Sequence, residues 1–160
     1  MAKATNPIPE GLHTITPHLT VKGAAQAIEF YKKAFGAVER NRMADPKGLV
    51  MHASLKIGDS SFFLNDEIPG QEAAHSPSQL SGTTVVLNLY VPDCDKTFNQ
   101  AISAGAKSVM PLADQFWGDR YGQVKDPYGH VWSIATHKED LTPAEMEERG
   151  RQAMAAARNG

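Results

Sequence analysis

The sequence predicts an α+β fold made of two copies of one unit, in which a strand is followed by a helix and three further strands. Three observations predict it. An alternating apolar stretch precedes an amphipathic helical stretch twice. The two copies lie about 70 residues apart, counted from Gly36 to Gly105. Turn signals divide the sequence after each helix into three strand-like segments.

The first unit is expected over residues 13–67. In its first strand Ile15, Leu19 and Val21 share one face, because side chains alternate along a strand. The helical stretch that follows has its apolar residues at helical spacing: Ala27, Phe30, Tyr31 and Phe35. Gly36 ends this helix. The segments AVERNRM, LVMHASLKI and SFFLN then alternate with the turn signals ADPKG and IGDS, which predicts three strands.

A segment rich in Pro, Ser and Gly, residues 68–82, is expected to link the units or to form a lid. The second unit is expected over residues 83–138. Its first strand has Leu87, Leu89 and Val91 on one face, and its helix is expected to begin after the N-cap Asp93 and to end at Gly105. The segments KSVMPLADQF, YGQVK and HVWSIAT complete it, separated by WGDR and by the tight turn DPYG.

The C-terminal segment predicts a last helix over residues 142–157. Thr142 is its expected N-cap, Pro143 takes the first helical position, and Glu145 lies three residues after the cap, which is a capping box. Because the apolar stripe of this helix is weak and its charged face is wide, we expect it to pack across the domain or against a second subunit.

Composition excludes several classes of protein. The formal net charge is −2, so there is no basic excess for a nucleic-acid backbone. Apolar runs are far shorter than the roughly 18 residues of a membrane helix, and the first residues lack the apolar stretch of a signal peptide. The one cysteine, Cys94, can form no internal disulfide and no multi-thiolate zinc site. These observations predict a cytoplasmic protein.

Three stretches carry a resemblance to a known family: AIEFYKKAFGA, HASLKIGDSSFFLNDE and DQFWGDRYGQVKDPYGHVWSIATHKEDLTPAEM. From about Ile15 to Arg149 the chain resembles the vicinal oxygen chelate (VOC) superfamily of glyoxalases, bleomycin-resistance proteins and extradiol dioxygenases, and within it the PhnB-like branch. The resemblance implies a glyoxalase-like fold, in which each unit curls its mixed sheet into a half-barrel. Two halves then enclose a cavity, within one chain or between the chains of a dimer.

The resemblance also implies where a metal ion would bind. The four ligand positions of the metal-dependent members correspond to Thr16, His52, Val86 and Ser133. Of these only His52 is a competent ligand, and a divalent ion needs three or four. We therefore expect no metal site and no cofactor, which argues against glyoxalase-like or dioxygenase-like chemistry.

Strand alternation predicts which side chains line the cavity. If the helices cover one face of each sheet, the opposite face carries Thr16, His18, Thr20, His52, Ser54, Lys56, Asn88 and Tyr90. Hydroxyls, imidazoles and an amide suit an organic ligand with several polar groups. From this set His18, His52, Asn88 and Tyr90 are predicted to bind it.

The stretch FWGDRYG is predicted to add Trp117, Arg120 and Tyr121 to the ligand-binding set. Gly118 and Gly122 flank them, so flexible backbone would present a guanidinium fork and aromatic faces to a planar or anionic ligand. The alternative is structural: an ion pair from Arg120 to Asp114 or Asp119, covered by Trp117.

The preferred prediction is a dimeric, bleomycin-resistance-like protein that binds a small organic molecule without the usual metal. A second prediction is a lyase, isomerase or dioxygenase that uses one divalent metal at a rearranged site of His18 and His52. A third is a dimeric interaction scaffold without a ligand. The sequence leaves catalysis open, and any activity would be of the glyoxalase or dioxygenase type.

Overall fold

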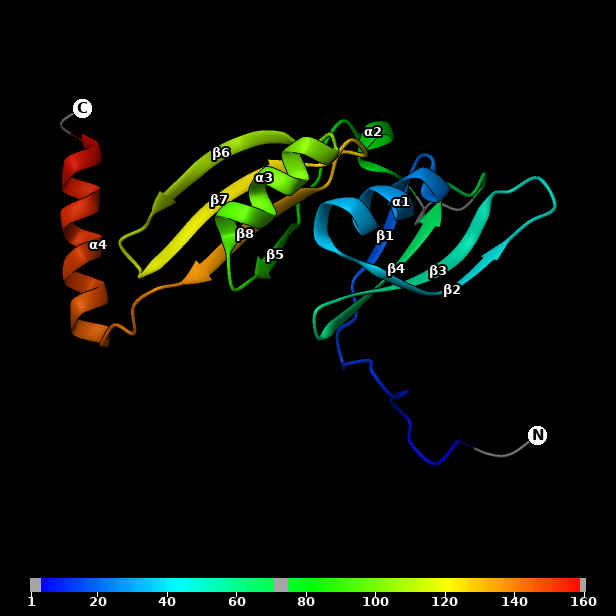
Figure 1. Ribbon diagram of the computed structural model, residues 1–160, viewed down its shortest axis with the longest axis horizontal. Coiled ribbons are helices and arrows are strands. Elements are labelled where there is room, and N and C mark those ends of the chain that lie inside the picture. The colour runs from blue at the N-terminus through cyan, green and yellow to red at the C-terminus, as the bar shows by residue number, and fades with distance from the viewer. Residues whose placement is uncertain (1–3, 71–74, 159–160) are drawn as a thin grey trace. The chain divides into compact units, whose positions relative to one another are not determined.

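The computed structural model describes residues 4–70 and 75–158 and confirms the α+β fold with two four-stranded mixed sheets. Contacts within the chain define two compact units. The first comprises the described residues up to Thr84 together with Pro127–His130, and the second comprises Val85–Asp126 and the described residues from Val131 onward. Each unit has one main helix beside its sheet (Figure 1).

The first unit contains β1 (His18–Val21), α1 (Ala24–Phe35), β2 (Val38–Ala44), β3 (Val50–Ile57), β4 (Ser60–Asp66) and the short α2 (Pro77–Leu80). The sheet order is β1-β4-β3-β2, with β1 parallel to β4 and the other pairs antiparallel. Helix α2 lies in the segment predicted as a linker, part of which, residues 71–74, is outside the described residues.

Helix α1 covers one face of the first sheet. Its Tyr31 and Ile28 are fully buried, and the strand residues with which this core is shared have little or no exposure: Leu19, Val21, Ala53, Leu55, Phe62 and Leu64. These strand residues alternate with neighbours that point the other way, as a half-covered sheet requires. The opposite face therefore carries polar and ring side chains.

The start of β1 differs from the sequence prediction. The strand begins at His18, and Ile15, expected on the core face, is 85% exposed. Thr16, expected on the cavity side, precedes the strand and donates its hydroxyl to the carbonyl of His13 at 3.1 Å. Pro17 explains the difference: it has no N–H for the ladder, and pairing starts where its carbonyl accepts from Phe63 N at 2.8 Å.

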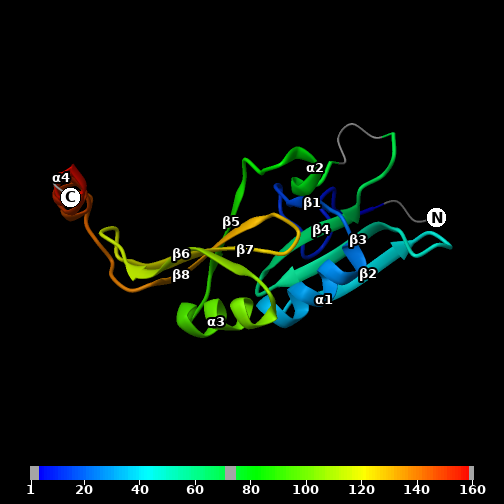
Figure 2. The ribbon, with the colours of Figure 1, turned by 90° about the horizontal axis from the view of Figure 1, so that it is seen from above.

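The second unit contains β5 (Val86–Tyr90), α3 (Cys94–Ala104), β6 (Lys107–Asp114), β7 (Asp119–Lys125), β8 (Val131–His137) and α4 (Pro143–Arg158). Its order, β5-β8-β7-β6, repeats that of the first sheet, again with one parallel pair, β5 and β8. Helix α3 covers one face of this sheet (Figure 2). Helix α4 contacts the β6–β7 loop, where Gly150 approaches Phe116.

Local capping fixes four helix ends as predicted. Asp93 Oδ1 accepts from Lys96 N at 2.9 Å at the start of α3, and Gly105 ends this helix with a φ of 119°. Gly36 ends α1 with a φ of 65°. The capping box of α4 is also present, because Thr142 N donates to Glu145 Oε2 at 2.9 Å while Glu145 N donates to Thr142 Oγ1 at 3.3 Å.

The start of α1 is capped from a distance. Its N-cap is Gly23, which has no side chain to accept a hydrogen bond. Asp66 at the end of β4 accepts instead, from Gly23 N at 2.9 Å and Ala24 N at 2.7 Å, while its other oxygen accepts from Val50 N at 2.8 Å. One buried carboxylate thus joins the helix start to two strands.

None of the helices in the described part of the chain is long and apolar enough to cross a membrane.

Candidate functional site

The face of the first sheet that points away from α1, here called the open face, gathers residues from three strands. His18 lies beside Phe63 across the β1–β4 pair, and Phe63 lies beside Ser54 across the β3–β4 pair. In the same way Lys56 lies beside Ser61. Because directly paired residues point to the same side of a sheet, all five belong to the open face.

Three rings form the centre of the open face. His52 and Phe63 have ring centroids 4.9 Å apart, His18 and Phe63 are 5.7 Å apart, and the two imidazoles are 5.9 Å apart, nearly edge to face. The structure thus places His18 and His52 side by side, but of the two only His52 lines the cavity of this face. Phe63, which sequence reasoning did not select, contacts both imidazoles and adds an apolar ring to this face.

The charge state of His18 depends on this environment. Partial burial lowers its pKa below the ordinary value of 6.5, and the nearby His52 lowers it further, while a hydrogen bond with Asn65 acts in the opposite direction. His18 is therefore a neutral imidazole at pH 7, with one nitrogen that donates and one that accepts.

A cavity of about 630 Å³ opens on this face, within the size range of small-molecule sites. The N-terminal segment 9–12 forms one wall, held by the hydroxyl of Ser61, which donates to the carbonyl of Gly11 at 3.0 Å. His52, Ser54 and Phe63 line the floor. A ligand there would meet imidazole, hydroxyl and apolar ring surface together.

The residues at the inherited metal positions do not fit a divalent ion. His52 is one imidazole, and Thr16 lies outside the strand with its hydroxyl engaged by the backbone. His18 adds a second imidazole, but within residues 4–70 and 75–158 no group of three or more His, Cys, Asp or Glu side chains is placed to hold a metal ion. Two imidazole ligands are fewer than zinc or its neighbours require.

In the second unit a buried carboxylate gathers several of the predicted residues. Asp119, 4% exposed, accepts from Tyr90 Oη at 2.8 Å, from Trp117 Nε1 at 3.1 Å and from His137 Nδ1 at 2.7 Å. Burial would raise the pKa of Asp119, but the hydrogen bonds from His137, Tyr90 and Trp117 outweigh burial and lower it. The same contact with Asp119 raises the pKa of His137.

Two further predicted residues lie on the same face of the second sheet. Tyr121 packs edge to face on Trp117, with centroids 5.5 Å apart, and its hydroxyl accepts from Gln123 Nε2 at 2.7 Å. Asn88 accepts a short hydrogen bond from the hydroxyl of Ser133. The structure thus brings Tyr90, Trp117 and Tyr121 together around Asp119, a residue that sequence reasoning considered only as a partner for Arg120.

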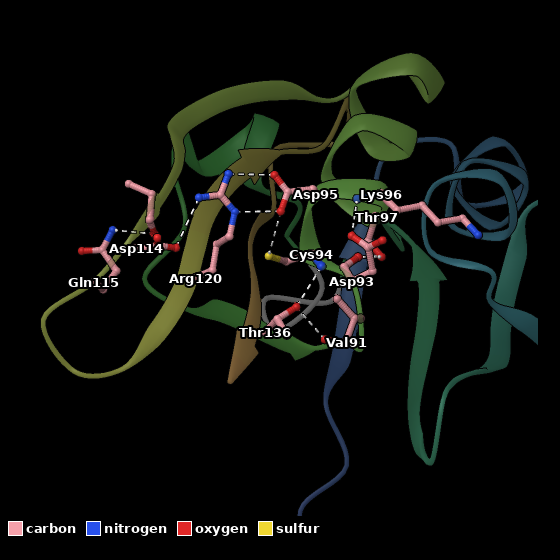
Figure 3. A network of polar contacts seen from close by, with 11 residues as sticks. Val91, Asp93, Cys94, Asp95, Lys96, Thr97, Asp114, Gln115, Arg120 and Thr136 are labelled. Atoms are coloured by element: carbon pink, nitrogen blue, oxygen red, sulfur yellow. Dashed lines mark hydrogen bonds and ion pairs between the residues drawn. The ribbon is translucent and has the colours of Figure 1, made fainter. Parts of the chain in front are cut away.

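Arg120 points to the other face of the second sheet. It lies beside Thr136, whose hydroxyl accepts from Cys94 N in the first turn of α3 at 2.8 Å. Its guanidinium forms a bidentate pair with Asp95 at 2.7 and 2.8 Å and a longer contact with Asp114 at 3.3 Å (Figure 3). The hydrogen bonds between the two side chains lower the pKa of Asp95 and raise the pKa of Arg120.

The stretch FWGDRYG is less loop-like than predicted. Strand β7 already begins at Asp119, so Arg120 and Tyr121 are strand neighbours on opposite faces. The glycines serve packing rather than flexibility. Gly118 has a φ of 92°, and a Cβ there would lie 2.5 Å from the carbonyl oxygen of Glu139. A Cβ on Gly122 would lie 3.1 Å from Leu112.

The structure also places residues that the sequence did not single out. Arg40 and Asn41 line the open-face cavity from β2. Asp95 adds a bidentate pair to the expected ion pair of Arg120 with Asp114. Phe63 was detectable in principle, because it alternates with Phe62 and Leu64 in a strand. The pairing of Arg120 with Asp95 has no local signal, since it depends on how α3 lies on the sheet.

The fold and this open face are typical of a glyoxalase-like protein. A family model of the Glyoxalase/Bleomycin resistance protein/Dioxygenase superfamily matches residues 11–134, and the chain belongs to this superfamily. Among curated proteins, the uncharacterized protein Rv0887c of Mycobacterium tuberculosis is 44% identical over 135 residues, which cover 83% of this chain and 79% of the relative.

Solved structures support the same assignment. The crystal structure of the Arabidopsis thaliana At5g48480 product has a TM-score of 0.62 and 29% identity, covering 78% of this chain and 98% of that chain. A PhnB protein from Bacillus cereus has a TM-score of 0.58 at 19% identity over 78% of this chain and 99% of that chain, which shows the fold. The predicted resemblance to this superfamily, with PhnB-like neighbours, is confirmed.

Proposed function

We propose that this protein binds a small organic molecule in the open-face cavity of its first unit and does so without a divalent metal ion. One observation carries the proposal: a cavity of about 630 Å³ lies on a sheet face that α1 leaves uncovered, with His52, Ser54 and Phe63 on its floor. Apolar surface with a few convergent polar groups is the usual composition of a ligand site.

A blocking variant tests this proposal. Ser61→Trp places a large ring in the cavity, whereas Ser60→Trp adds the same ring at the neighbouring exposed position, which does not line it. Ligand-observed NMR with a panel of small aromatic acids, amides and alcohols should find compounds that bind the wild-type protein and Ser60→Trp but not Ser61→Trp. If no compound binds, or if Ser61→Trp binds the hits equally well, the proposal is wrong.

The metal-dependent alternative is tested separately. Because the donor set around His18 and His52 is too small, protein purified without added metal should contain far less than one divalent ion per chain. A chelator should leave its melting temperature unchanged, since no bound ion contributes to folding. Stoichiometric zinc, nickel, manganese or iron would instead favour a lyase, isomerase or dioxygenase.

We further propose that the protein works as a two-fold homodimer in the cytoplasm. Each sheet has two edge strands, and apolar side chains of the second unit are exposed: Val86 by 47%, Val109 by 53% and Met154 by 65%. Uncovered edges and apolar residues are commonly covered by a second subunit. The buried free thiol of Cys94 is consistent with a reducing compartment.

A further inference from the structure

Two cations that form no ion pair with the described carboxylates line the cavity of the open face. Arg40 of β2 and Lys56 of β3 both line it, and within residues 4–70 and 75–158 neither forms an ion pair. Two other cations of the first unit are paired: Lys32 lies 2.8 Å from Glu39, and Arg42 lies 2.7 Å from the same carboxylate. Lys22 and Lys47 likewise form no ion pair within the described residues, but they do not line the cavity. Arg40 and Lys56 are thus the cations available to a ligand in the cavity.

An irregularity in β2 directs Arg40 to this cavity. Glu39 pairs with Leu55 on the α1 side, and Asn41, two positions later, pairs with Ser54 on the open face. The register shift between them leaves Arg40 as the extra residue of a bulge, and both Arg40 and Asn41 line the cavity. Bulges redirect side chains in this way and recur beside functional sites.

The charge of the cavity lining is opposite to that of the whole chain. The lining contains two cations, Arg40 and Lys56, and a single carboxylate, Glu10, whereas the formal net charge of the chain is −2. Ser54, 8% exposed, and Asn41 supply neutral hydrogen-bonding groups beside these cations. A guanidinium and an ammonium near hydroxyl and amide groups are suited to bind a carboxylate or phosphate group.

We propose that the ligand of the open-face cavity is anionic and carries a planar or apolar body. Its anionic group is bound by Arg40 and Lys56, and its body lies against the rings of Phe63 and His52, whose centroids are 4.9 Å apart. This inference rests on the proposed function, because it names the ligand class of the same cavity. It adds a charge preference that the proposed function does not require.

The test compares two probes of equal shape, 2-naphthoate and its neutral amide, 2-naphthamide, by calorimetry or NMR titration. The wild-type protein should bind naphthoate about tenfold more tightly, and added salt should reduce this preference. Arg40→Gln and Lys56→Gln should each weaken naphthoate binding about three- to tenfold, as expected for partly solvated ion pairs, and leave naphthamide binding nearly unchanged.

Two variants that remove the same charge elsewhere in the first unit serve as matched controls. Arg42→Gln and Lys47→Gln change residues that do not line the cavity, so naphthoate affinity per folded molecule should stay within about twofold of wild type. An equal loss in these controls would mean that overall charge, not the cavity, attracts the anion, and would overturn the inference.

The outcomes separate the two proposals. If naphthoate and naphthamide bind equally well and both are blocked by Ser61→Trp, the proposed function stands and the charge preference is wrong. If naphthoate does not bind, or if Arg40→Gln and Lys56→Gln leave its affinity unchanged, the charge preference is also wrong. If no compound of either kind binds in the cavity, both proposals fail.

Discussion

The pKa of His18 depends on the rings that surround it on the open face. Its pKa lies below 6.5 because burial disfavours the imidazolium, and the charge of His52 adds to this effect. The unfolded chain therefore binds this proton more readily than the folded protein does. The free energy of unfolding is then higher above pH 6.5 and declines as the pH falls through the window below it.

Substitution of His52 tests this arrangement. In His52→Gln the pKa of His18 should rise toward 6.5 but remain below it, because burial, the larger cause, persists. An NMR titration of the imidazole C–H signals measures the pKa of His18 in the wild-type protein and in the variant. A wild-type midpoint at or above 6.5, or no shift in the variant, would contradict the contact between these two rings.

Arg120 is predicted to act on stability rather than on binding in the first unit. Arg120→Ala removes its contacts with Asp95 and Asp114 and should lower the melting temperature, whereas Lys107→Ala, at an exposed position of the same unit, should not. The double variant Arg120→Ala with Asp95→Ala should be less destabilised than the sum of the single variants, as a thermal double-mutant cycle would show. Additive losses would mean that the pair contributes nothing.

At the scale of elements, replacing glycine by alanine should have opposite effects on stability at two positions of the second unit. Gly150→Ala in α4 should stabilise the protein by about 0.5–1 kcal/mol, because alanine favours the helix. The new Cβ would lie 3.4 Å from Phe116 Cε2, which is close to ordinary contact.

Gly122→Ala in β7 should instead destabilise by about 1–3 kcal/mol, because its Cβ would lie 3.1 Å from Leu112 atoms in the neighbouring strand. Urea unfolding of both variants measures the difference. Destabilisation by Gly150→Ala would mean that α4 packs on Phe116 more closely than the structure describes.

Elements with local signals were predictable from the sequence. Asp93, Gly105 and the capping box at Thr142 fixed helix ends within a few residues, because each acts on backbone groups next to it. The predicted positions at which β1 and β7 begin were wrong, because strand ends depend on pairing with distant segments.

The candidate site was predictable only in part, for the same reason. The alternation of side chains along the strands predicted that His18 and His52 share one face, and the strand register confirms this. It missed Arg40, because a bulge changes the alternation without any residue that marks it, and it placed Arg120 in a loop although the residue lies in a strand. Partners such as Asp95 follow only from the packing of a helix on a sheet.

At the scale of the whole molecule, assembly is the main open prediction. Light scattering at micromolar concentration should report a homodimer, and its melting temperature should rise with protein concentration. Truncation after Leu141 removes α4, with its ion pair from Arg149 to Glu139 and its contact on Phe116, and should weaken assembly or stability. A monomer, or a truncated protein with unchanged assembly and stability, would contradict the role given to α4.

The carboxylate of Asp66 sets an order for the folding of the first unit. Helix α3 carries its own cap in Asp93, so its first turn can be stabilised early from local sequence. Helix α1 depends on Asp66, 42 positions away from Ala24, and its first turn is completed only after β4 has formed beside β1. Both helix starts are joined to a distant strand, since Cys94 N donates to Thr136 Oγ1, but only α3 also has a side-chain cap next to it in the sequence. A peptide of the second helix that includes Asp93 should therefore retain more order in its first turn than a peptide of the first helix.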